Sequence, residues 1–109
     1  MNKYLSFEYQ GKTYEVEFDR ETFVKAEQSG FDINRVLSQP LSQSRIAMRF
    51  GLNKNHPNLN ERIFKEVFDY FCDEYGIDEF LGFVGESYAS FMTTTQQSSE
   101  KKNLNILQR

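Results

Sequence analysis

The sequence predicts an α+β fold that is predominantly helical, with an N-terminal antiparallel β-hairpin packed on four or five helices. Two observations carry this prediction. Apolar and polar residues alternate on both sides of Gln10-Gly11, and apolar residues recur with helical spacing over most of the remaining chain. A length of 109 residues fits one domain with its own core. We expect a single domain over residues 1–94, followed by a flexible polar tail over residues 95–109.

Residues 4–18 are predicted to form the hairpin, with a two-residue turn at Gln10-Gly11. Gly11 supplies the positive φ that such a turn requires. The turn sets a register that gathers the apolar side chains on one face and the polar side chains on the other. The apolar face then contains Leu5, Phe7, Tyr9, Tyr14, Val16 and Phe18. A lone hairpin is marginal in water, so this face is expected to pack on helices.

Capping signals predict where the first helix begins and ends. Asp19 is a suitable N-cap for a helix that runs to about Ser29. Phe18 and Phe23 have the spacing of a hydrophobic staple around that cap. Gly30 then ends the helix in a left-handed conformation.

The rest of the chain is predicted to be helical, apart from one loop before Pro57. Asn58 and Glu61 have capping-box spacing at the start of the third long helix, and Gly76 ends that helix. The predicted segments are a short helical turn over residues 32–37, a helix over 41–52, a loop over 53–57, a helix over 58–76 and a helix from 78 to about 93.

The helix over residues 60–75 has an unusually wide apolar face. At about 100° per residue, its apolar side chains spread over roughly 200°, against about 100° for an ordinary surface helix. They are Ile63, Phe64, Val67, Phe68, Tyr70, Phe71, Cys72 and Tyr75. Such a helix is either clasped by neighbours on two sides or offers one side to another protein. The two interpretations are compatible, and the sequence leaves both open.

Composition and motifs argue against several classes of function. A net charge of −3 disfavours nonspecific binding to nucleic acid, which needs a basic face. No apolar run is long enough for a membrane span, and the start of the chain does not resemble a signal peptide. The single cysteine, Cys72, favours a reducing cytoplasm.

Candidate catalytic and metal-binding groups are few. His56 is the only histidine, and its place before Pro57 favours a turn or capping role over a base or metal ligand. Cys72 is expected to be a buried, inert thiol. The acidic residues 73–74 and 78–79 lack the ligand spacing of an EF-hand. We therefore expect a protein without catalytic activity, cofactor or metal, which works through contact with other proteins.

Motifs spread over about residues 5–92 carry a resemblance to a known family. They are residues 7–18, 20–22 and 27–33, Pro40, Phe50-Gly51, residues 55–57, and a C-terminal helix ending in Tyr88. The most distinctive are the Tyr9-x-Gly-Lys-x-Tyr14 hairpin and the Gly-Phe-Asp-Ile segment over residues 30–33. With these motifs the chain resembles tail assembly chaperones of long-tailed phages of Gram-positive bacteria.

The resemblance implies a function for the chain. Chaperones of this family coat the tape measure protein in the host cytoplasm and help to recruit tail tube subunits. The major tail tube protein is therefore a further expected partner. A long, apolar, helical partner would otherwise aggregate. Shielding it is easier for an oligomer, so we expect self-association. A small acidic phage inhibitor, or an anti-defence protein that binds a host protein, stays open as the alternative.

The residues expected to contact the partner lie off the probable core direction of their helices or in the tail. They are Ile63, Tyr70 and Phe83 in the two last helices, and Leu104, Ile106 and Leu107 in the tail. A short apolar cluster on a polar tether can act as a docking peptide.

Overall fold

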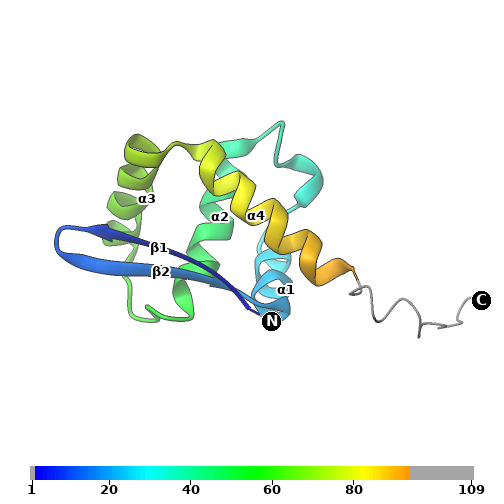
Figure 1. Cartoon of the computed structure of the whole chain (residues 1–109), viewed down its shortest axis with the longest axis horizontal. Coiled ribbons are helices and arrows are strands. Elements are labelled where there is room, and N and C mark those ends of the chain that lie inside the picture. The colour runs from blue at the N-terminus through cyan, green and yellow to red at the C-terminus, as the bar shows by residue number, and fades with distance from the viewer. Residues whose placement is uncertain (1, 94–109) are drawn as a thin grey trace, which may run out of the picture.

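A computed structural model describes residues 2–93 of the chain and confirms the α+β class, with a hairpin followed by helices (Figure 1). The predicted tail, with Leu104, Ile106 and Leu107, lies outside the described residues. The elements are β1 (Lys3–Tyr9), β2 (Lys12–Phe18), α1 (Arg20–Gln28), the 3-10 helix η1 (Ile33–Arg35), α2 (Pro40–Asn53), α3 (Glu61–Tyr75) and α4 (Ile77–Met92). Among the described helices, none combines the length and the apolar character that crossing a membrane requires.

The hairpin has the predicted turn and register. Gln10 and Gly11 have φ values of 51° and 78°, which fits the left-handed conformation of a type I′ turn. Phe7 lies opposite Tyr14 and Leu5 opposite Val16, as the alternation predicts. In Figure 1 the turn reaches the end of the molecule near α3, whereas the open end of the hairpin lies near α1.

The start of α1 also follows its sequence signals. Asp19 Oδ1 accepts a hydrogen bond from the backbone N–H of Thr22 at 2.8 Å, which confirms Asp19 as the N-cap. The rings of Phe18 and Phe23 stack with centroids 4.5 Å apart, as expected for a staple. Gly30 follows the helix with a φ of 109°, a conformation that favours glycine.

The predicted N-cap of α3 is wrong by two residues. Asn60, not Asn58, caps the helix, and its side-chain oxygen accepts from the backbone N–H of Ile63 at 2.8 Å. The intervening Leu59 donates its N–H to the His56 carbonyl at 3.2 Å and packs half-buried against the core. Burial of this leucine therefore extends the loop and moves the helix start to Glu61.

Helix α2 lies at the centre of the described structure, because it contacts β2, α1, α3 and α4. Arg49 of this helix lies over the Phe64 ring at 5.2 Å and donates to the Leu59 carbonyl at 3.2 Å. The core around α2 is formed mainly by aromatic and aliphatic side chains from every long element. Its fully buried large members are Phe18, Phe64, Phe71, Phe80, Met48, Leu52, Val16, Val67 and Val84.

Candidate partner-binding surfaces

Most of the wide apolar face of α3 packs against other elements of the same chain. On the hairpin side, the Phe71 ring lies 5.1 Å from Phe7, and the Tyr70 ring lies 4.7 Å from Tyr9. On the other side, Phe71 meets Phe80 of α4 at 5.8 Å. The structure thus supports the clasped interpretation for most of this face.

The three described residues that were expected to contact a partner are half-buried and pack against the core. Ile63 lines a hollow with Leu59 and residues of β2. Tyr70 lies at the turn end of the hairpin, whereas Phe83 packs 5.6 Å from Phe18 at the opposite end. Contact of Ile63, Tyr70 and Phe83 with a partner stays a prediction, and the structure does not gather them in one surface.

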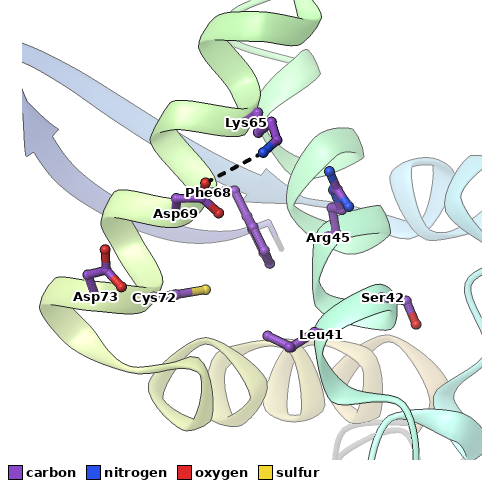
Figure 2. Close-up of a pocket in the computed structure, with 8 residues that line it drawn as sticks. All are labelled: Leu41, Ser42, Arg45, Lys65, Phe68, Asp69, Cys72 and Asp73. Atoms are coloured by element: carbon purple, nitrogen blue, oxygen red, sulfur yellow. Dashed lines mark ion pairs between the residues drawn. The ribbon is translucent and has the colours of Figure 1, made fainter.

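A groove between α2 and α3 is a surface that the sequence analysis missed (Figure 2). It has a volume of about 630 Å³ and lies beside the first two turns of α2. Its lining residues are Leu41, Ser42 and Arg45 from α2, and Lys65, Phe68, Asp69, Cys72 and Asp73 from α3. Phe68 and Cys72 belong to the wide apolar face, so the groove is the part of that face left open between the helices.

The floor of the groove is apolar. Figure 2 shows Phe68 and Cys72 reaching from α3 towards α2, with Leu41 facing them. Phe68 is buried, whereas Leu41 is 59% exposed. Burial, with Asp69 and Asp73 nearby, raises the pKa of the Cys72 thiol, so the thiol stays neutral at pH 7 and adds to the apolar surface.

The rim of the groove is charged and polarised along its length. Figure 2 shows Arg45 and Lys65 near one end and Asp73 near the other. Lys65 Nζ lies 4.0 Å from Asp69 Oδ2, and both side chains are more than 60% exposed. Such an exposed pair contributes little to folding stability, so these charges are free to orient a ligand at low cost.

His56 has a structural role on the opposite side of α3. Its Nε2 accepts a hydrogen bond from the backbone N–H of Glu15 at 3.0 Å, and its ring lies 5.2 Å from Tyr14. Burial, assisted by the charge of Lys12, lowers the pKa of His56 below its ordinary value of 6.5. The neutral imidazole therefore ties the loop before α3 to β2. Within residues 2–93, no three His, Cys, Asp or Glu side chains are grouped so that they could hold a metal ion.

Comparisons with curated proteins and with solved structures gave no match. A family model described as a domain of unknown function (DUF5055) matches residues 1–108. Because this match spans nearly the whole chain of 109 residues, the protein belongs to the DUF5055 family.

Proposed function

We propose that the protein is a noncatalytic tail assembly chaperone of a long-tailed phage. In the host cytoplasm it binds and shields helical segments of the tape measure protein, and it thereby assists assembly of the tail tube. The observation that supports this function best is the groove between α2 and α3, which combines an apolar floor with a polarised rim.

The groove suits a helix as its occupant. It is flanked by two helices of 14 and 15 residues, which present about 20 Å of length each. A third helix can pack against such a pair at an interaxial distance of about 8–10 Å. Apolar side chains one turn apart on the occupant would contact Leu41, Phe68 and Cys72, which is the usual mode of helix-in-groove recognition.

The charges of the rim favour one orientation of the bound helix. Arg45 suits the C-terminal end of the occupant, because the helix dipole is negative there, whereas the charge of Lys65 is partly offset by Asp69 at 4.0 Å. Asp73, near the other end, suits its positive N-terminal end. A tape measure segment with acidic residues towards its C-terminal end and basic residues towards its N-terminal end fits this polarity.

The family resemblance of residues 5–92 supports the same partner, since a tape measure protein is long, helical and apolar. A groove of this size covers only a few turns of helix, which implies many weakly bound copies along one tape measure chain. Weak contacts of this kind suit a chaperone that must leave when the tail tube closes around its client.

Coexpression with the tape measure protein of the same phage tests the proposal. The soluble fraction of the tape measure protein should rise with the wild-type chain and fall back with Leu41→Glu, which places a charge in the groove. Leu41 is 59% exposed, so this variant should fold. Leu37→Glu is the matched control, because Leu37 is 91% exposed and outside the groove. A tape measure protein that is equally insoluble with and without the wild-type chain refutes the chaperone function.

A further inference from the structure

On each outer edge of the hairpin, alternate residues direct their backbone N–H and C=O groups away from the partner strand. Tyr9 and Lys12 flank the two-residue turn and form a hydrogen-bonded pair, and such pairs alternate along an antiparallel ladder. The N–H and C=O groups of Tyr4, Ser6 and Glu8 therefore point away from β2. On β2, the corresponding outward groups belong to Thr13, Glu15 and Glu17.

The outer edge of β2 is covered by the loop before α3. Glu15 donates its outward N–H to His56 Nε2 at 3.0 Å. Glu17 is only 7% exposed, and its carboxylate accepts a hydrogen bond from the Asn55 side chain at 3.0 Å. A strand edge closed in this way cannot pair with another chain.

The outer edge of β1 is open. Among residues 2–93, the outward backbone groups of Tyr4, Ser6 and Glu8 have no backbone partner, and all three residues are exposed. An open strand edge is a template for pairing with a further strand.

Apolar surface continues beyond β1. On the inner face of the sheet, Val16 and Phe18 of β2 are completely buried, whereas Leu5 and Tyr9 of β1 are only half-buried. Tyr75 at the end of α3 is 45% exposed, and its ring lies 6.3 Å from Phe7. A strand added beside β1 would cover these side chains.

We propose that the β1 edge pairs antiparallel with β1 of a second copy of this chain, so that a symmetric dimer contains one four-stranded sheet. The register is centred on Ser6, which then faces the same residue of the second copy. Tyr4 faces Glu8 of the second copy, and the outward backbone groups of all three residues are hydrogen-bonded. This interface does not depend on the proposed function.

The sequence of β1 is compatible with pairing to itself. In the register centred on Ser6, Leu5 faces Phe7 and Lys3 faces Tyr9 on the inner face, so no like charges lie opposite each other. The two-fold axis repeats every contact, and both exposed Tyr75 rings border the joined sheet. Pairing also converts a marginal two-stranded ribbon into a four-stranded sheet.

Ser6→Pro tests the interface, because it removes an outward N–H that the β1–β2 ladder does not use. Light scattering should show a wild-type dimer and a Ser6→Pro monomer, while circular dichroism shows the same helix content in both. Thr13→Pro is the matched control, since its N–H points outward from the other edge, and it should remain dimeric. A monomeric wild-type chain, or a dimer that Ser6→Pro leaves intact, overturns the proposal.

Crosslinking tests the register. In a Cys72→Ser background, Ser6→Cys places two thiols opposite each other across the two-fold axis, at a Cα separation of about 5.5 Å that a disulfide can span. Mild oxidation should produce a covalent dimer from Ser6→Cys and none from Thr13→Cys. Absence of the Ser6→Cys crosslink overturns the centred register. The crosslink would also be absent if the edge paired only with an extended peptide from another protein.

Discussion

His56 links two parts of the chain that lie 41 positions apart in sequence. Its neutral Nε2 accepts the Glu15 N–H, and its ring packs beside Tyr14. A protonated imidazole would have no lone pair to offer to this N–H. The hydrogen bond therefore exists only while His56 is neutral, and burial of the ring favours that neutral form.

The stability of the fold should therefore depend on the charge of His56. Its pKa is lowered in the folded state, so the unfolded chain binds the proton more readily. The stabilisation is complete above the ordinary pKa of 6.5 and decreases as pH falls below that value. Urea unfolding on both sides of this pH should show a drop for the wild type and a smaller drop for His56→Gln, which cannot be protonated. Equal drops in the two proteins would contradict this role.

At the residue scale, the sequence predicts a helix N-cap correctly where only one suitable capping residue is present. Asp19 was identified as the first cap because no other capping residue lies beside it. Asn58 and Asn60 are both suitable N-caps, and only Asn58 has capping-box spacing to Glu61. Asn60 is nevertheless the cap, because Leu59 packs half-buried against the core. The burial of Leu59 depends on tertiary packing, which the spacing of capping residues does not encode.

Helix α2 approaches strand β2 closely at Gly51. A Cβ atom placed on this residue would lie 2.5 Å from Val16 Cγ1 and 3.1 Å from the Phe18 ring. Both neighbours are completely buried, so neither can move away without disturbing the core. The close contact between helix and sheet thus requires a residue without a side chain.

Gly51→Ala should lower the free energy of unfolding by about 1–3 kcal/mol, the usual cost of overpacking a core. Gly82→Ala in α4 is the matched control, because a Cβ there meets nothing within 4 Å among the described residues. It should raise the free energy of unfolding by up to about 1 kcal/mol, as alanine favours a helix over glycine. Chemical denaturation of both variants measures the difference, and an unchanged or more stable Gly51→Ala would show that the backbones can separate.

At the element scale, the sequence predicted the apolar width of α3 and left open that neighbours clasp it on two sides, but it did not predict the groove beside α2. The helical period gives the direction of each side chain, whereas the identity of the element that covers it depends on how distant segments pack. Phe71 is covered by both Phe7 and Phe80, while Phe68 and Cys72 border an open groove. That groove depends on the separation of α2 and α3, which no local pattern encodes.

Aromatic contacts join the hairpin to the helices throughout the described structure. Phe18 at the open end of the hairpin contacts Phe23 of α1 and Phe83 of α4. Phe7, in the middle of β1, contacts Phe71 of α3 at 5.1 Å. Because a two-stranded sheet is marginal by itself, the strands and the helices share one core and depend on each other.

Unfolding should therefore be a single cooperative transition. The circular dichroism of the helices and the fluorescence of the tyrosines, which include Tyr9 and Tyr14 of the hairpin, should change at the same urea concentration when protein concentration is fixed. Phe7→Leu, which weakens the contact with Phe71, should move both transitions together to lower urea. If the tyrosine signal alone moved, the packing around the tyrosines, three in the hairpin and three in α3 and α4, would be lost before the helices unfold. The strands and the helices would then not depend on one shared core.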